Sequence, residues 1–246
     1  MPEAVGTFPR MVGAYPDGSL LLASDAAASN TAEFKTGVRR ERSALLRVSP
    51  AGALIGQVAE VPSTEQYASV SPDGRGFRLQ SLPFGRRTVM AISGNDLYVG
   101  TGEDAAIRAF GLDGSSRHLL RVPADRKRVA AADINQYWKR LVTSGSSRDG
   151  EGPPPGEIPY PDALPPYAAL NVDRAGRLWV GESRLPREWD QPATWWVFRP
   201  DGALAATIRI PGRMHVLEIG EDWLLGREMD ADERETVSLY RFRPAR

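Results

Sequence analysis

The sequence predicts an all-β fold, a β-propeller built of four-stranded antiparallel blades, and two repeated patterns lead to this prediction. The first is a run of three large apolar residues that ends in Gly or Ala, found at 20–23, 97–100, 178–181 and 223–226. The second is a pair of β runs joined by an Asp-Gly or Ala-Gly turn and closed by a proline, which follows three of the four copies. A turn-and-strand unit that recurs in a fixed order indicates a β-repeat architecture.

Each repeat is interpreted as four antiparallel strands. An apolar run precedes each opening turn and the turn leads into the repeated phrase, which supplies the first two strands of a blade. The runs on either side of the Asp-Gly or Ala-Gly turn supply the third and fourth strands, and the proline ends the last run because it lacks the N–H that a sheet needs. We therefore expect a single propeller domain over 1–246, with blades at about 11–62, 88–123, 168–211 and 215–243.

The fourth blade ends after its third strand, so its outer strand is missing from this reading. The stretch 4–8 is the only candidate for a strand that completes it from the other terminus. A pair of two-layer sandwiches would also use many short strands. That arrangement does not explain why the same two patterns recur in the same order, so the propeller is favoured.

Composition excludes several classes of function. Lys plus Arg and Asp plus Glu number 31 each, and a net charge of zero argues against nucleic acid as a partner. The absence of cysteine excludes disulfides and thiolate metal sites, and the only two histidines are His118 and His215. The first residues show no signal-peptide pattern, and no apolar run is long enough to predict a membrane-spanning segment. These residues leave the compartment undetermined.

The stretch 171–181, followed by 197–202, resembles the bacterial six-bladed β-propellers of the NHL and SMP-30-like kind. The likeness covers most of 10–243 and is greatest to uncharacterised six-bladed propeller proteins that are typically exported. It implies a six-bladed ring in a periplasmic or secreted protein. The chain has four recognisable units, so we expect an N-terminally incomplete copy that lacks about two blades. A closed ring of four blades is the alternative.

Strand direction predicts where a ligand site lies. In an antiparallel blade, the loop between the second and third strands and the crossing to the next blade share one face of the propeller. All four long segments fall on that face: 25–43, 63–87, 124–167 and 182–193. Because loops carry function more often than the scaffold does, we expect a site there, over the central channel.

The long segments differ in character. We expect a solvated loop at 25–43, an extra hairpin within 63–87, and a short helix over 125–141 with Asp125 as its N-cap. The seven prolines of 146–166 predict a strap across the propeller face, with a polyproline ligand for an SH3-like domain as the less favoured reading.

The candidate ligand-binding residues are the charged and aromatic side chains of this face. Arginine forks suit a carboxylate or phosphate, a loop tryptophan can stack on a sugar or peptide, and one imidazole lies near the channel. The set is Arg86, Arg87, Glu103, Asp104, Glu182, Arg184, Trp189 and His215. Solvated loop charges, a tryptophan that anchors its own loop and a structural histidine are the simpler explanation of the same residues.

The sequence favours a binding or interaction scaffold over an enzyme. The resemblance implies a metal-dependent, gluconolactonase-like hydrolase as the alternative, but the metal-ligand Asp of that family would stand at Ala168. We therefore assign no metal ligand and no cofactor, although a divalent cation stays possible. No Ser-centred elbow predicts a nucleophile, and catalytic residues stay unknown. The expected partner is an unidentified small molecule, sugar, peptide or protein.

Overall fold

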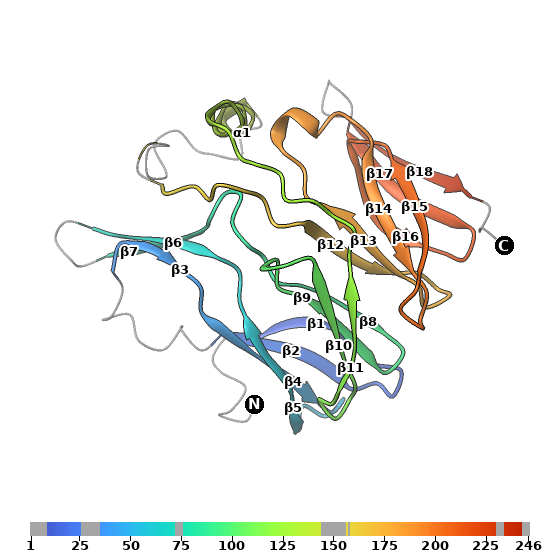
Figure 1. The fold of residues 1–246 in the computed structure, drawn as a ribbon. Coiled ribbons are helices and arrows are strands. Elements are labelled where there is room, and N and C mark those ends of the chain that lie inside the picture. Colours follow the sequence, from blue (N-terminus) through green and yellow to red (C-terminus); the bar gives the residue numbers. More distant parts are fainter. Residues whose placement is uncertain are drawn as a thin grey trace.

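The computed structural model describes residues 9–25, 35–71, 76–143, 156, 158–229 and 234–242. Four antiparallel sheets follow one another along this part of the chain, and we call them blades 1 to 4 (Figure 1). Blade 1 has the order β1-β2-β4-β5, blade 2 β8-β9-β10-β11 and blade 3 β12-β13-β14-β15, whereas blade 4 has only β16-β17-β18. The predicted all-β fold of four-stranded antiparallel blades is confirmed.

The strand bounds follow the two repeated patterns. Blade 1 contains β1 (Arg10–Ala14), β2 (Leu20–Asp25), β4 (Arg42–Val48) and β5 (Leu54–Pro62). Blade 2 contains β8 (Val89–Ser93), β9 (Asp96–Gly100), β10 (Ala106–Phe110) and β11 (Ser116–Arg121). Blade 3 contains β12 (Tyr167–Val172), β13 (Leu178–Glu182), β14 (Ala193–Phe198) and β15 (Leu204–Ile210), and blade 4 contains β16 (Met214–Ile219), β17 (Trp223–Met229) and β18 (Glu235–Arg241).

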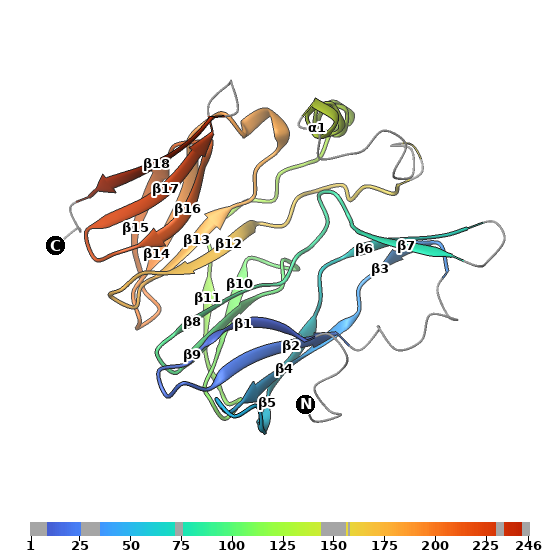
Figure 2. The same ribbon diagram turned by 180° about the vertical axis from the view of Figure 1, so that it is seen from behind.

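The described blades form an open arc, with blade 1 at one end and blade 4 at the other (Figures 1 and 2). The inner strands β1, β8 and β12 are neighbours in that order. Blade 4 has three strands among the described residues, as the sequence predicts. The proposed closing strand at 4–8 lies outside the described residues.

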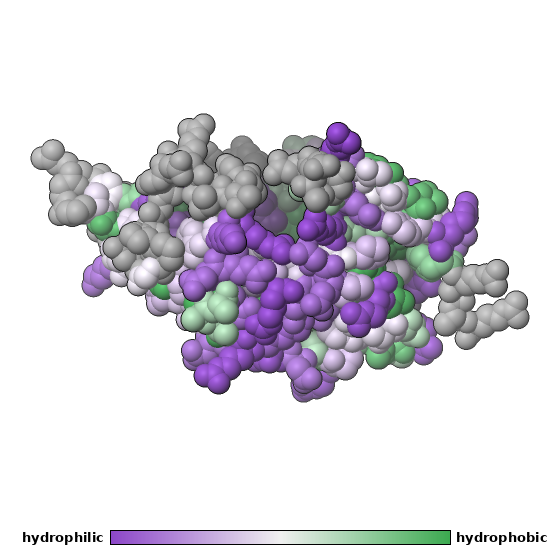
Figure 3. Space-filling view, turned by 90° about the horizontal axis from the view of Figure 1, so that it is seen from above, coloured by the Kyte–Doolittle hydropathy of each residue, from purple (hydrophilic) through white to green (hydrophobic). Residues whose placement is uncertain are grey.

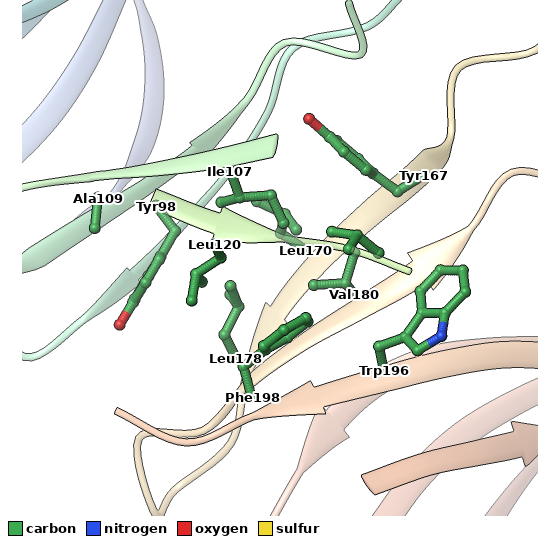
Figure 4. Packing of buried hydrophobic residues seen from close by; sticks show 11 residues of the cluster. Tyr98, Ile107, Ala109, Leu120, Tyr167, Leu170, Leu178, Val180, Trp196 and Phe198 are labelled. Carbon is green, nitrogen blue, oxygen red and sulfur yellow. The ribbon is translucent and has the colours of Figure 1, made fainter. Parts of the chain in front are cut away.

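The core is divided into layers between successive blades. Leu21 and Leu45 of blade 1 pack with Leu97 of blade 2, and Ile107 of blade 2 packs with Phe198 of blade 3. Figure 4 shows this second layer, in which apolar side chains from both blades interdigitate. Because side chains alternate along a strand, each sheet can supply one apolar face to each neighbour.

The two adjacent tryptophans of β14 illustrate this alternation. Trp195 joins the layer between blades 3 and 4, and Trp196 joins the layer between blades 2 and 3. The two rings therefore lie on opposite sides of the sheet.

A fifth sheet corrects the prediction for segment 25–43, which we expected to be a solvated loop. Its strand β3 (Gly37–Arg39) pairs with β6 (Gln66–Val70), which pairs with β7 (Phe77–Ser81). The hairpin predicted within 63–87 is therefore confirmed, and it gains a third strand from a distant part of the chain. Three residues are too few to give a periodic signal in the sequence.

The helix α1 (Ala131–Thr143) begins six residues later than predicted, and Asp125 is not its N-cap. The buried carboxylate of Asp133 accepts a hydrogen bond from the backbone N–H of Ala130 at 3.0 Å. Just before the helix, the backbone of 127–129 is extended and hydrogen-bonds to 162–164. This pairing with the described part of the proline-rich segment takes the residues that sequence spacing assigned to the first helical turns.

Gly100 lies where blades 2 and 3 approach each other closely around the Tyr167 ring. A Cβ atom at this position would lie 2.5 Å from the Tyr167 ring of the next blade, whereas a Cβ at Gly56 would meet nothing within 4 Å. We expect Gly100→Ala to lower the free energy of unfolding by about 1–3 kcal/mol through overpacking. Denaturant unfolding measures this change, with Gly56→Ala as the control. Equal stability of the two variants would contradict this account of the blade 2–blade 3 contact.

Candidate functional site

The long segments lie on one side of the blades. The helix α1, the 3-10 helix η5 (Pro186–Glu188), the β6–β7 hairpin and the described segment 158–166 lie there, and we call this side the loop face (Figures 1 and 2). Seen from the side of α1, hydrophilic residues cover much of the described surface (Figure 3). The short turns between strands lie at the opposite ends of the blades.

A pocket of about 410 Å³ opens within the loop face, and we call it the loop-face pocket. The end of β13, the start of β12, α1 and the chain just before β8 all contribute to it. Its lining residues are Phe84, Gly85, Arg87, Tyr137, Leu164, Pro165, Tyr167, Ala168, Glu182, Ser183, Arg184 and Trp189. Four of the eight candidate residues from the sequence, Arg87, Glu182, Arg184 and Trp189, are therefore brought together.

Aromatic rings form one wall of the loop-face pocket. The ring centroids of Phe84 and Tyr137 are 5.3 Å apart, and those of Tyr137 and Trp189 are 6.3 Å apart. The Trp189 indole N–H donates to the carbonyl of Arg184 at 3.2 Å, and the Arg140 guanidinium lies 5.3 Å from the Trp189 ring centroid. The indole thus anchors its own loop while its ring remains part of the wall.

Glu182 is held in a local network. Its carboxylate accepts a hydrogen bond from the backbone N–H of Thr194 at 2.6 Å and one from the Lys127 ammonium at 3.0 Å. The same ammonium donates to Glu188 at 2.8 Å. Burial acts to raise the pKa of Glu182, but the hydrogen bonds from Thr194 and Lys127 outweigh it and the pKa is lowered. Glu182 is therefore an ionised, fully engaged carboxylate at neutral pH.

The guanidinium of Arg184 is bonded to backbone carbonyls of the protein. It donates to the carbonyls of Gly212 at 2.8 Å and Gln191 at 2.9 Å, and to that of Glu188. Burial lowers the pKa of Arg184, and the nearby carboxylates of Glu182 and Glu188 oppose that shift. Three carbonyl partners leave this guanidinium little capacity for a ligand.

Arg87 differs from its neighbours in the loop-face pocket. Its side chain is exposed, and no hydrogen bond or ion pair joins its guanidinium to another described residue. Burial raises the pKa of the half-buried Tyr137 hydroxyl, and the nearby charge of Arg87 opposes that rise. The Tyr137 hydroxyl likewise has no hydrogen-bond partner among the described residues.

The other four candidates lie outside the loop-face pocket. Arg86 pairs with the buried carboxylate of Glu65, with 2.7 Å from its Nε to Oε1, and both line a second pocket of about 390 Å³. Glu103 accepts from Arg40 at 3.2 Å, and Asp104 caps its own turn through the backbone N–H of Ala106 at 3.1 Å. His215 is an exposed residue of β16 in blade 4.

Arg40 is a structural residue that sequence reasoning missed. Only 11% of its side chain is exposed, and its guanidinium donates to the carbonyls of Ser63 at 2.8 Å and Thr101 at 2.5 Å. It thereby ties blade 1 and blade 2 together on the loop face. The run of charges at 39–42 gave no signal of this, since charge runs are usually solvated.

Asp173 stabilises the turn between β12 and β13. Its buried carboxylate accepts from the backbone N–H groups of Ala175 at 3.0 Å and Arg177 at 2.8 Å, and from the Trp179 indole at 2.8 Å. It therefore caps its own turn, as expected for an Asp at this position. In the described part of the chain, no three His, Asp or Glu side chains group together so as to hold a metal ion.

A third pocket lies between blades 3 and 4 and is mostly apolar. It has a volume of about 240 Å³, and its lining includes Trp179, Ile208, Leu224 and Tyr240. It lies beside β18, the third strand of blade 4. In each of the other three blades, a fourth strand pairs with the third. We interpret it as part of the core layer that three strands cover incompletely.

Comparison with known proteins gives only distant matches. No family model and no curated protein matches the chain. The CNH domain of AfRom2 matches with 10% identity and a TM-score of 0.34, over 96% of this chain and 65% of that one. A catalytically inactive virginiamycin B lyase from Staphylococcus aureus, crystallised with quinupristin, matches with 10% identity and a TM-score of 0.32, over 95% of this chain and 84% of that one.

The chain thus spans slightly less than two thirds of the CNH-domain chain. At this identity and TM-score, neither match bears on function or on the number of blades. Among the described residues, no helix is long and apolar enough to cross a membrane.

The Glu182 network predicts a pH-dependent contribution to stability. A carboxylate whose pKa is lowered in the folded state stabilises it above the unfolded pKa, and this contribution is lost as pH falls through the folded pKa. We expect Glu182→Gln to lower the free energy of unfolding at pH 7 by about 1–3 kcal/mol, with the difference shrinking as pH falls below 4.

Denaturant unfolding at several pH values measures this effect. The control is Glu218→Gln, which removes an exposed pair with Arg174 and should change stability by less than about 1 kcal/mol. A Glu182→Gln deficit that does not change with pH would contradict the assignment of an ionised, hydrogen-bonded carboxylate.

Proposed function

We propose that the protein is a β-propeller-type binding scaffold that takes a small molecule in the loop-face pocket. The observation that carries the proposal is the combination, in one pocket, of the aromatic wall and the guanidinium of Arg87, which has no partner among the described residues. Binding pockets for small molecules are concave and largely apolar, with a few polar groups that fix the ligand's orientation. Its volume of about 410 Å³ falls within the usual range for such sites.

The lining of the pocket supports binding over hydrolysis. The carboxylate of Glu182 is engaged by Lys127 and Thr194, and Arg184 is engaged by backbone carbonyls. Ser183 offers a hydroxyl, but no histidine is among the described lining residues to act as its base. The alternative is a propeller hydrolase of the gluconolactonase-like kind. The described lining contains no nucleophile–base pair for such an enzyme, and position 168 is alanine where the resemblance implies a metal-ligand Asp.

The assignment to the six-bladed NHL and SMP-30-like kind, and a periplasmic or secreted location, remain part of this proposal. The repeated phrases of the sequence support them.

A blocking substitution tests the site. Ala168 is exposed and lines the loop-face pocket, so an indole at this position would occupy the space of a ligand. A fragment library screened by ligand-observed NMR should yield ligands that bind the parent protein, and Ala168→Trp should weaken them about tenfold or more. Ala51→Trp, in the tight turn after β4, is the matched control and should leave binding unchanged. Ligands that bind Ala168→Trp as well as the parent would place the site elsewhere.

A further inference from the structure

We propose that the ligand of the loop-face pocket carries a carboxylate, which the Arg87 guanidinium and the Tyr137 hydroxyl receive. The proposal rests on the function proposed above and names the chemical class of the ligand. The planar or apolar body of the ligand would lie against the aromatic wall.

The first step is a count of charges in the pocket. The Lys127 ammonium faces two carboxylates, Glu182 and Glu188, at 3.0 and 2.8 Å. Arg184 faces backbone carbonyls and lies near the same two carboxylates. Arg140, whose guanidinium lies against the Trp189 ring, pairs with Asp190 at 2.6 Å. The remaining charge in the lining is that of Arg87, which has no ion pair with a described residue. The pocket therefore offers one uncompensated positive charge, which favours a singly charged anion.

The second step concerns hydrogen-bond donors. The five N–H groups of a guanidinium form a fork that matches the two oxygens of a carboxylate. The hydroxyl of Tyr137 is a second donor near Arg87, and burial raises its pKa, so it keeps its proton at neutral pH. Both groups line the same pocket and lack a partner among the described residues, so together they can satisfy both oxygens of a carboxylate. A phosphate dianion would need more compensating charge than the pocket supplies.

The third step is the position of Arg87 in the chain. Its neighbour Arg86 is fixed, because the backbone N–H of Arg86 donates to the buried Glu65 carboxylate at 2.7 Å and its side chain pairs with the same group. The carbonyl of Arg86 also accepts from the backbone N–H of Glu65 at 2.9 Å. These contacts hold the backbone beside Arg87, whose guanidinium has no partner among the described residues. The backbone of the site is therefore preorganised, and binding a ligand has to order the Arg87 side chain.

The fourth step is the body of the ligand. The Tyr137 ring lies between Phe84 at 5.3 Å and Trp189 at 6.3 Å, measured between centroids. A ring attached to the carboxylate can pack against these faces, and such contacts add about 0.5–1.5 kcal/mol beyond the area they bury. An aromatic carboxylate thus satisfies the donors and the apolar wall together.

Titration by NMR with three related probes tests the ligand class: naphthoate, the neutral naphthamide and naphthyl phosphate. We expect naphthoate to bind the parent protein more tightly than the other two. Arg87→Gln should weaken naphthoate about tenfold or more and leave naphthamide within about twofold. Tyr137→Phe should weaken naphthoate by a smaller factor, and the melting temperature of each variant confirms that it folds.

The matched control is Arg121→Gln, which removes one exposed positive charge from β11. It should leave naphthoate affinity unchanged, which separates a local contact from a general effect of net charge. Equal binding of naphthoate by the parent and Arg87→Gln would overturn the proposal, and so would tighter binding of naphthyl phosphate. If naphthamide binds, naphthoate does not, and Ala168→Trp abolishes the naphthamide binding, the carboxylate proposal is wrong and the proposed pocket stands. If no probe binds in a manner sensitive to Ala168→Trp, the proposed pocket itself is wrong.

Discussion

Tyr167 joins the scaffold to the pocket, and the close approach of blades 2 and 3 depends on it. The residue is 1% exposed, and its hydroxyl donates to the carbonyl of Ala106 at 2.7 Å and accepts from the backbone N–H of Gly102 at 3.4 Å. Burial raises its pKa to about 12, so the hydroxyl stays protonated and donating. Its ring fits only because residue 100 is glycine. In this copy of the repeated phrase, the final glycine therefore has a physical role, which is to admit a large side chain from the next blade.

The charged groups of the loop face act mainly as internal tethers. Arg40 bonds carbonyls of two blades, Arg184 binds the loop after β13, and the Arg187 guanidinium pairs with the buried Asp133 at the start of α1. Loops of this length carry many backbone groups that a sheet cannot satisfy, and guanidinium donors supply the missing partners. The polar appearance of the loop face in Figure 3 thus reflects loop anchoring as much as recognition.

Sequence patterns predict the features that depend on near neighbours. The apolar phrases with their turn glycines predict the blades, and strand alternation accounts for the opposite sides of the sheet on which Trp195 and Trp196 lie. The strand β3 and the start of α1 depend on partners about thirty residues away, and no local period encodes them. The burial of Arg40 is of the same kind, because its partners lie in other segments.

The candidate site separates in the same way. Residue type and loop position select Arg86, Arg87 and Arg184 together. An arginine on a loop gives the same sequence pattern whether its guanidinium bonds to the protein or binds a ligand. The structure distinguishes them by their acceptors: Arg86 has a buried carboxylate, Arg184 has three carbonyls, and Arg87 has none among the described residues. The proposed site therefore depends less on how many charges gather at the loop face than on which of them lack a partner among the described residues. Under the proposal, Arg87 and the Tyr137 hydroxyl supply the hydrogen-bond donors of the pocket.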